Sequence, residues 1–509
     1  MSSLKERLSR LKKSGDGADG AAAGTADTAP VTSREAEADT KGPGETLALG
    51  PAWERLGAAA QDNDRGSFVI RRRRYALDYA HGTYRLGELC GTAHRLEALA
   101  ATGGKRGSRT GRAGDAARSG GGTIPSVRHD RLLFLDTETT GLGIGAGNVA
   151  FMVGIGFYES DAFVVEQLFI RNPAEEAAML HHLRERLAER DMLVSYNGKS
   201  FDWPILKNRY VLNRQKEGAA DPVHFDFLYP SRSLWRNTLP SCRLSSVERE
   251  RLGLTRIDDV PGSLAPALYF QYLAEGDPVL LAGVFEHNEK DVLTLACLAV
   301  HFSKLLDEGL PSGSAAMEAE EVYRHALWLD KLGRAELADE AYRELLGREP
   351  DESADYWLPA ADYYKRNGLY GPAVALWERL VERKRRARVA PVEPYIELAM
   401  YYEHQLKDFD QALRYAEQAL ERARGRLSAV RQERAAAELD AIRKRIDRLR
   451  AKRDAAGNSA DGGRRAMASA PMASTDVGRS AGRPKAAPNG RGRRTKAERA
   501  PAVWQETLL

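Results

Sequence analysis

Two carboxylates at the end of an apolar run are the side chains of this sequence best placed to do chemistry. Residues 132–135 are Leu-Leu-Phe-Leu, and Asp136 and Glu138 follow at spacing i, i+2. Such a run ending in a Thr-Thr-Gly turn predicts a buried strand, on which residues i and i+2 face the same side. Carboxylates brought together repel one another, and a divalent cation such as Mg²⁺ or Mn²⁺ relieves that repulsion. The alternative is a strand end with two solvated acids.

Asp202 is a further acid that suits a metal site. It closes the segment Asn-Gly-Lys-Ser-Phe-Asp at 197–202, which follows a short apolar run over 192–196. Active sites of open α/β sheets lie at the carboxyl ends of strands, so an acid at this position is well placed to bind metal. The structural alternative is a helix N-cap, a role that aspartate often takes.

His287 and Asp291 form a pair on one predicted helix. They are spaced i, i+4 within 286–295, so their side chains share one helix face. There the carboxylate could bind metal while the imidazole accepts a proton from water. An ion pair on the protein surface is the alternative for these two residues taken alone. The four acids and the histidine, in this order, are far more specific than any one of them.

The elements that must position these residues are predicted within residues 128–305. Three strands come first, and shorter strands then alternate with helices. This order predicts an α/β domain with a mixed sheet flanked by helices. The predicted strands are one around Asp136 and those at 148–158, 162–170, 192–196 and 224–228, and the main predicted helices are 173–190, 200–213 and 278–306.

Residues 136–138, 197–202 and 287–291 resemble, in this order, the three motifs of the DEDD superfamily of 3′–5′ exonucleases. Residues 66–305, which include Arg-Ile-Asp-Asp-Val-Pro-Gly at 256–262, resemble in particular the YprB-like ribonuclease-H-fold proteins of bacteria. The resemblance implies a ribonuclease-H-like fold for the α/β domain.

The resemblance also implies a mechanism, which is two-metal hydrolysis of phosphodiester bonds. Two Mg²⁺ or Mn²⁺ ions would be held by Asp136, Glu138, Asp202 and Asp291. His287 would help to deprotonate the attacking water. The sequence departs from the superfamily at this residue: the third motif is His-x4-Asp or Tyr-x3-Asp, and the histidine here stands at the tyrosine spacing.

Three residues before Asp202 are the predicted contacts of the terminal nucleotide. Asn197 and Lys199 would bind phosphate through an amide and an ammonium group, and the Phe201 ring would lie against a base. The alternatives for these side chains are loop capping and core packing. The predicted partner is nucleic acid, either DNA or RNA.

A second, all-α region is predicted over residues 316–452. The windows that begin at Gly333, Gly368 and Lys407 align without gaps, and each lies between two amphipathic helices. Helix-turn-helix units with a period near about 34 residues are typical of tetratricopeptide-like repeats, which predicts a protein partner. An unrelated helical bundle is the alternative. The long charged helix after the last window is expected to cap the repeats.

The remaining segments are predicted to be a small β/α lead-in at 66–99, a Gly/Arg-rich linker at 100–127, and disordered tails at 1–50 and 455–509, the second of them basic. The tails have too few large apolar residues to build a core. The four arginines at 71–74 could contact phosphates, or they could protect a solvated edge strand from aggregation.

Composition excludes several classes of protein. The 509 residues leave room for about three domains, and the net charge of +4 says little about partners. Three cysteines without paired or metal-type spacing predict a reducing cytoplasm and no disulfide framework. The first residues lack the apolar core of a signal peptide, and no apolar run reaches the ~18 residues of a membrane span.

The leading hypothesis is therefore a metal-dependent nuclease, a 3′–5′ exonuclease with a helical repeat domain for a protein partner. Two alternatives stay open: a scaffold that carries a catalytically silent domain, and a protein that binds nucleic acid without cleaving it. The presence of all four acids favours the enzyme, because a silent domain has no metal to hold.

Overall fold

The computed structural model describes residues 49–100, 126–141, 143, 147–215, 221–311, 316–385, 390–425 and 432–468, which all belong to one compact unit. The tail predicted over 1–50 lies almost wholly outside these residues, as does most of the linker predicted over 100–127. The last helix continues to Ala468, into the tail predicted from 455, and the rest of that tail lies outside the described part.

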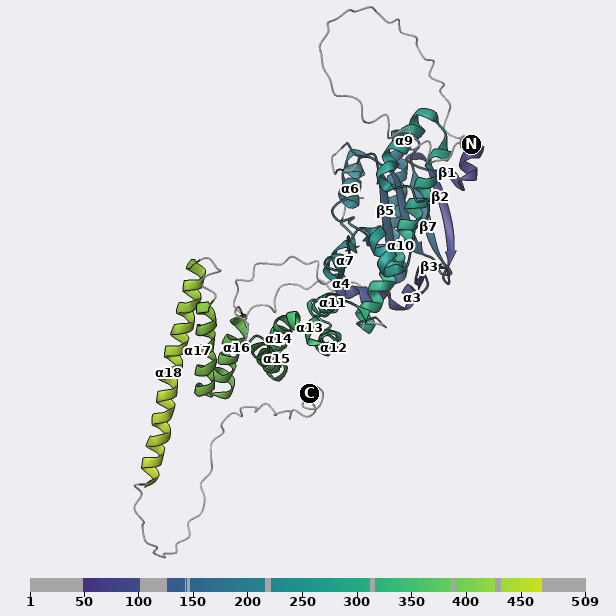
Figure 1. The fold of residues 1–509 in the computed structure, drawn as a ribbon. Coiled ribbons are helices and arrows are strands. Elements are labelled where there is room, and N and C mark those ends of the chain that lie inside the picture. Colours follow the sequence, from purple (N-terminus) through teal and green to yellow (C-terminus); the bar gives the residue numbers. More distant parts are fainter. Residues whose placement is uncertain are drawn as a thin grey trace, which may run out of the picture. The chain divides into compact units, whose positions relative to one another are not determined.

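A seven-stranded mixed sheet lies at the centre of the first half of this unit (Figure 1). Its strand order is β1-β2-β7-β6-β5-β8-β9; β5, β8 and β9 are parallel, and the other neighbours are antiparallel. The predicted mixed sheet is thereby confirmed. The strands are β1 (Ala58–Asn63), β2 (Gly66–Ala76), β5 (Leu132–Thr139), β6 (Ala150–Tyr158), β7 (Ala162–Phe169), β8 (Met192–Ser195) and β9 (Val223–Asp226), and a separate pair is formed by β3 (Ala80–His81) and β4 (Tyr84–Arg85).

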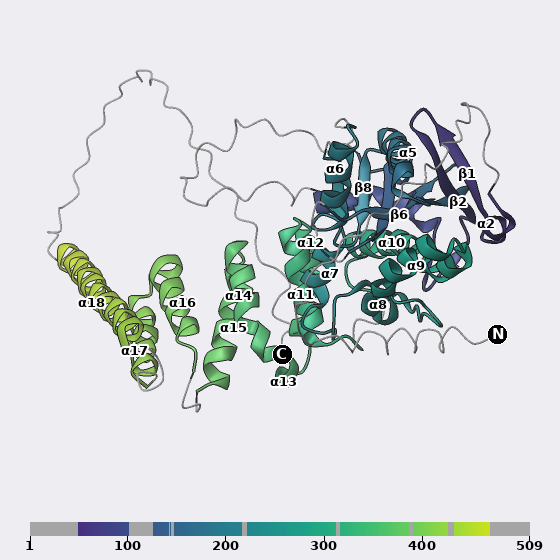
Figure 2. The same cartoon turned by 90° about the horizontal axis from the view of Figure 1, so that it is seen from above.

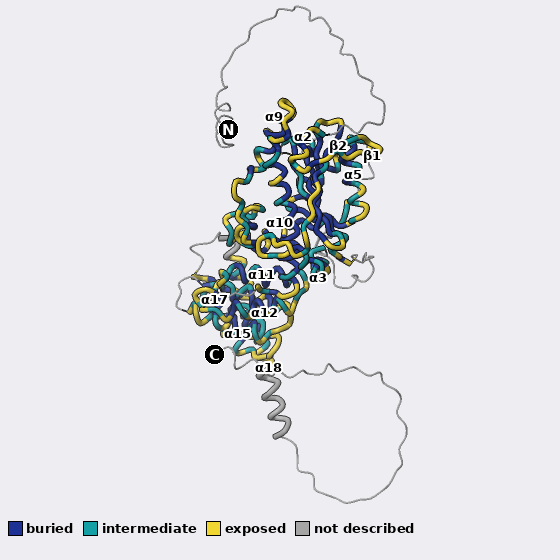
Figure 3. Tube along the Cα trace, turned by 90° about the vertical axis from the view of Figure 1, so that its right-hand side faces the viewer, coloured by how far each residue is buried: buried dark blue, intermediate teal, exposed yellow. Residues whose placement is uncertain are grey.

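Helices cover both faces of the sheet, and alternate residues of β5 point into the two resulting cores. Leu132 and Phe134 pack with the long helix α10 on one side, and Leu133 and Leu135 pack with α5, α6 and α9 on the other. Because both faces are covered, β6 and β7 are buried along their whole length, including the polar Glu166 and Gln167 of β7. Figure 3 shows how the buried residues gather in the interior of the domain. These helices are α5 (Glu176–Glu189), α6 (Asp202–Leu212), α9 (Ala265–Glu275) and α10 (Ala282–Glu308).

Strand β2 carries the four arginines and lies between β1 and β7, but β1 pairs with it only as far as Arg71. Arg72, Arg73 and Arg74 lie on an exposed stretch that pairs with β7 alone. The solvated edge strand considered for the arginines is thus confirmed for these three and wrong for Arg71. Arg72 and Arg74 pair with Glu159, which follows β6. The Arg71 guanidinium is buried and lies 2.9 Å from Glu289 of α10. These ion pairs tie β2 to the rest of the domain.

Helices fill the second half of the unit in antiparallel pairs. The turn between the helices of each pair contains a residue in the left-handed region, at Gly333, Gly368 and Lys407, which are the first residues of the three aligned windows. Such a residue closes a helix and reverses the chain. The pairs are α11 (Ala319–Lys331) with α12 (Ala335–Leu346), α14 (Trp357–Arg366) with α15 (Tyr370–Arg383), and α16 (Glu393–Tyr401) with α17 (Phe409–Gly425), and α18 (Gln432–Ala468) packs on α17 (Figure 2).

Short helices complete the described chain. None of the helices in the described part is long and apolar enough to cross a membrane. The short helices are α2 (Pro51–Arg55), α3 (Glu88–Thr92), α4 (Glu97–Ala100), α7 (Leu228–Trp235), α8 (Leu244–Val247) and α13 (Pro350–Ser353).

Candidate active site

Asp136 lies on β5 at the point where α10 crosses the sheet. The side-chain amide of Asn288 on α10 donates a hydrogen bond of 2.9 Å to Asp136 Oδ2. Asp136 pairs across the sheet with Gly154 of β6, and a Cβ atom at Gly154 would lie only 2.2 Å from Asn288 Oδ1. The glycine therefore leaves the space in which α10 approaches the strand. Glu138 follows on the same face of β5, is 8% exposed, and receives no hydrogen bond from the described residues.

Asp202 is the first residue of α6, just after the carboxyl end of β8. The Thr137 hydroxyl of β5 donates a hydrogen bond to Asp202 Oδ1. The loop before it is held by Asp226 of β9, which accepts hydrogen bonds from the backbone amides of Asn197 and Lys199. Strands β5, β8 and β9 thus place three acidic residues along one edge of the sheet, as expected for parallel strands.

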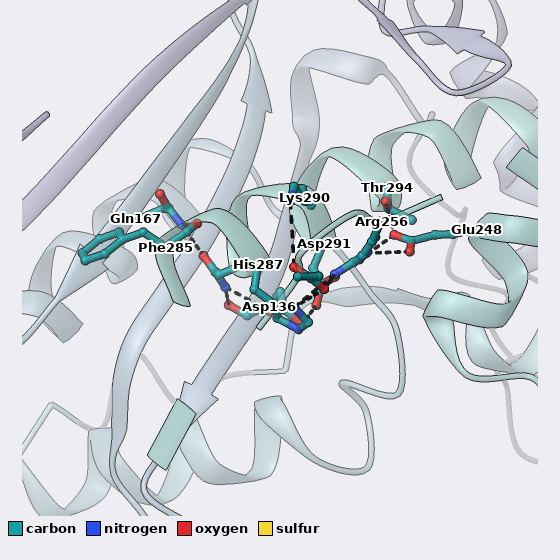
Figure 4. A network of polar contacts seen from close by, with 11 residues as sticks. Asp136, Gln167, Glu248, Arg256, Phe285, His287, Lys290, Asp291 and Thr294 are labelled. Carbon is teal, nitrogen blue, oxygen red and sulfur yellow. Dashed lines mark hydrogen bonds and ion pairs between the residues drawn. The ribbon is translucent and has the colours of Figure 1, made fainter. Parts of the chain in front are cut away.

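Asp291 lies on α10 and receives a hydrogen bond from Arg256 (Figure 4). Arg256 also contacts both carboxylate oxygens of Glu248, at 2.6 and 2.7 Å, and Asp259 at 3.1 Å. Glu248 in turn accepts a hydrogen bond from Thr294. The guanidinium is therefore fixed by three carboxylates and places one positive charge directly on Asp291.

His287 lies one turn before Asp291 and contacts two acids. Its Nδ1 is 2.8 Å from Asp259 Oδ2, and its Nε2 is 3.5 Å from Asp291 Oδ2. A Cβ atom at Gly262 would lie 3.3 Å from Nε2, so the absence of a side chain there leaves room beside this nitrogen. Nδ1 also lies 3.2 Å from Arg256 Nη1. In the tautomer that donates Nδ1–H to Asp259, Nε2 carries the lone pair that can accept a proton.

The acids at this edge disturb one another's ionisation. Burial, together with the charges of Asp291 and Asp202, raises the pKa of Asp136 and of Glu138 well above its usual value. Burial also raises the pKa of Asp202 to about 6, against the hydrogen bond from Thr137. Burial raises the pKa of Asp291 as well, although Arg256 and His287 oppose this. Burial thus raises the pKa of all four acids, and the charges of Asp291 and Asp202 add to this for Asp136 and Glu138. Divalent cations would stabilise such a set of oxygen donors.

The acids are close together but are not yet arranged around one point. Within the described ranges, no three Asp, Glu, His or Cys side chains are gathered as ligands of a single ion. The reason lies in their present partners, because Asn288 holds Asp136, Thr137 holds Asp202 and Arg256 holds Asp291.

Several residues of the site carried no role in the sequence analysis. Asn288 stands next to His287, but a lone asparagine on a helix is not a recognisable signal. Arg256 and Asp259 were noticed only as part of a resembling segment, and their i, i+3 spacing is the signal that they act together. Asp226 could have been found as the acid that ends the last parallel strand.

Comparison with known proteins gives the class that this fold and site define. The family model described as the RNase_H superfamily matches residues 133–303, which span β5 to α10. The chain is also 34% identical over 378 residues to the protein named "Uncharacterized protein YprB" of Bacillus subtilis (strain 168), an alignment that covers 72% of this chain and 83% of that protein. The chain belongs to the family of that protein, with a ribonuclease-H-like domain followed by a helical region. Membership of the superfamily supports nuclease-type chemistry on nucleic acid.

Proposed function

We propose that this protein is a metal-dependent 3′–5′ exonuclease whose catalytic domain corresponds to residues 128–305. The observation that carries the proposal is the convergence of Asp136, Glu138, Asp202 and Asp291, whose pKa values are all raised by burial in one place. A buried cluster of acids in which only Asp291 meets an arginine is costly, and such a cluster is expected where cations bind.

The four acids would hold two Mg²⁺ or Mn²⁺ ions. Such ions, when bound, stabilise the charge that develops on a phosphodiester during hydrolysis. His287 would accept a proton from the attacking water at Nε2, and Asp259 would hold its ring in place through Nδ1. Arg256 would fix the position of Asp291, and Asn288 that of Asp136.

The substrate would enter along the loop that precedes Asp202. Asn197 is exposed and has a φ of 69°, a conformation that is uncommon for a residue other than glycine and is frequent at functional sites. Lys199 is exposed beside it, and Phe201 is half-buried. These three residues support contacts to the phosphates and base of the terminal nucleotide. Binding of a protein partner by the helical repeats stays a prediction.

The test is hydrolysis of a 5′-labelled single-stranded oligonucleotide with Mg²⁺, with Mn²⁺ and with a chelator. We expect a ladder that shortens from the 3′ end, only with metal, and loss of this ladder in Asp136→Asn with Asp202→Asn. Asp161→Asn with Asp351→Asn removes the same number of charges from side chains that are 75% and 92% exposed, and should keep the activity.

Other products would contradict parts of the proposal. Internal fragments would indicate an endonuclease, and release of the label as a mononucleotide would indicate the opposite polarity. Binding without cleavage under any metal condition would favour the protein that binds nucleic acid but does not cut it. Neither binding nor cleavage would favour the scaffold.

A further inference from the structure

A groove lies at the carboxyl end of β9, beside the loop that precedes Asp202. One cavity of about 400 Å³ is bounded by Lys199, by Tyr229 of α7, and by Trp328 and Lys331 of α11. A second cavity of about 460 Å³ shares Lys199 and His224 with it and continues along β9 toward the amino end of that strand, where Asp221 and Trp203 of α6 line it. Helix α11 is the first of the helical repeats, so the repeats supply one wall of this groove.

The groove lies on the same edge of the sheet as the four acids. Phe134 pairs with Val194, and Val194 pairs with Phe225, so Asp136 on β5 lies about one residue beyond the level at which β8 and β9 end. Neighbouring strands are about 4.8 Å apart, which puts the end of β9 about 10 Å from Asp136. Adjacent nucleotides of one strand could therefore occupy both places.

The charges of the groove suit an anion. Neither Lys199 nor Lys331 forms an ion pair with any residue in the described part of the chain. The carboxylate of Asp226, which also faces the groove, is taken up by three backbone amides, those of Asn197, Lys199 and Leu228. Two ammonium groups are thus left for an anion.

The remaining walls of the groove suit a base. Tyr229 is 52% exposed, and the Lys199 ammonium lies 6.0 Å from the centre of its ring. His224 donates or accepts a hydrogen bond with Ser195 at 2.7 Å, and burial, together with the Lys199 charge, lowers the pKa of His224 to about 3, so the imidazole is neutral. An exposed aromatic ring beside cations is the usual surface on which a nucleic-acid base stacks.

We propose that this groove binds the nucleotides next to the terminal one in a single nucleic-acid strand, with Lys199 on the phosphate that joins them to it, Lys331 on a further phosphate and Tyr229 on a base. The proposal rests on the nuclease function proposed above, and it gives the first helical repeat a part in substrate binding. Trp328 is 5% exposed and packs in the core, so it shapes the groove and does not stack on the substrate.

The test uses the full chain and a fluorescent single-stranded DNA oligonucleotide, with a chelator present so that binding is measured without hydrolysis. The salt dependence of the dissociation constant counts phosphate contacts, at about 0.7 per phosphate for a single strand. Lys199→Gln with Lys331→Gln should lower the slope by about 1.4. Tyr229→Ala should weaken binding by about 5- to 150-fold, the usual loss for one stacked base.

The matched control is Lys384→Gln with Lys444→Gln, which removes two charges outside the groove, one just after α15 and one on α18. A slope that falls equally in both double variants would overturn the proposal, because it would reflect total charge. A slope unchanged by the Lys199 and Lys331 replacements, in a protein that still degrades DNA with metal, would overturn the groove and leave the nuclease. A slope lowered only by those replacements, in a protein that degrades nothing, would support the groove and count against the nuclease.

Discussion

The ribonuclease-H-like domain and the helical region both bury acids, but the charge of these acids is balanced in opposite ways. Glu403, which follows α16, has no exposed side-chain surface and is surrounded by cations from α18: Arg445 at 3.2 Å, Arg448 at 3.0 Å and Lys452 at 2.8 Å. In the ribonuclease-H-like domain, Arg256 is the cation that contacts Asp291, and the other three acids are met by an amide, by a hydroxyl or, for Glu138, by no described partner.

The pKa values of the two groups of acids are shifted in opposite directions. Burial raises the pKa of Glu403, but hydrogen bonds from Arg448 and Lys452 more than offset this and lower it to about 2. The acids of the sheet edge have raised pKa values instead. A buried carboxylate with a structural role, such as Glu403, is neutralised by cations of the same chain. Acids of a catalytic site are expected to lack such cations, because a bound ligand neutralises them.

The largest expected effect comes from His287→Ala. If His287 accepts a proton during hydrolysis, the turnover rate should fall by about 10²–10⁴-fold, because that is the usual contribution of a general base. The affinity for Mn²⁺, measured by titration, should change little, since the four acids remain. If His287 instead neutralises Asp291, as the cations around Glu403 do, metal affinity would change and the rate would not. That result would mean that His287 has a structural role and is not the general base.

A smaller effect is expected from Glu403→Gln. The replacement leaves three cations without their acid and should lower the free energy of unfolding by about 1–3 kcal/mol, as measured by denaturant unfolding. Glu417→Gln is the matched control, because Glu417 also pairs with an arginine of α18 but is 48% exposed, and surface pairs contribute about 0–1 kcal/mol. Equal losses of unfolding free energy in both variants would mean that the buried Glu403 contributes no more than an exposed ion pair.

The same difference between wild type and Glu403→Gln should depend on pH. The folded pKa of about 2 is below the ordinary value of 4.5, so the stabilisation by Glu403 is fully present above about pH 4.5. It should disappear as the pH falls toward 2, where the acid is protonated in both folded and unfolded states. The groups around it, Arg445, Arg448 and Lys452, stay charged throughout that range. A difference that is constant between pH 5 and 2.5 would contradict this assignment.

The smallest effect is expected from Asp202→Asn in the presence of a chelator. Removal of one charge from the uncompensated group should raise the free energy of unfolding by about 1 kcal/mol, opposite in sign to Glu403→Gln. Asp64→Asn changes an exposed side chain and should have little effect. Destabilisation by Asp202→Asn would mean that its hydrogen bond from Thr137 outweighs the repulsion.

The strand order and most elements of the sheet could be predicted only in part from the sequence. The apolar runs at β5, β6 and β7 are long and bounded by turns, so these strands could be predicted from the sequence pattern. Strand β1, with Ala-Ala-Ala-Gln-Asp-Asn, has no such pattern, because it pairs at an edge and buries only Ala58. That β2 lies between β1 and β7 depends on contacts across the fold, which no local pattern contains.

Site residues that belong to short sequence motifs could be predicted. Residues that act through partners far away in the sequence could not. The i, i+2 spacing of Asp136 and Glu138 is enough to predict that both side chains lie on the same face of the strand. The contact of Arg256 with Asp291 joins positions 35 apart, and that of Asn288 with Asp136 joins positions 152 apart. The groove at Lys199 also has α11 as one wall. The sequence of α11 shows that the helix is amphipathic, but it does not show which part of the chain the helix packs against.

The position of β2 inside the sheet has a consequence for the order of events during synthesis. Its arginines precede the β7 region in the chain, and Arg72 is 87 positions from its partner Glu159. At about 5–20 residues per second, the ribosome needs roughly 4 to 17 s to deliver that partner. Until then the nascent hairpin of β1 and β2 presents an open strand edge. Four adjacent positive charges on that edge discourage its pairing with other chains, so the arginines that later join the domain first keep it from aggregating.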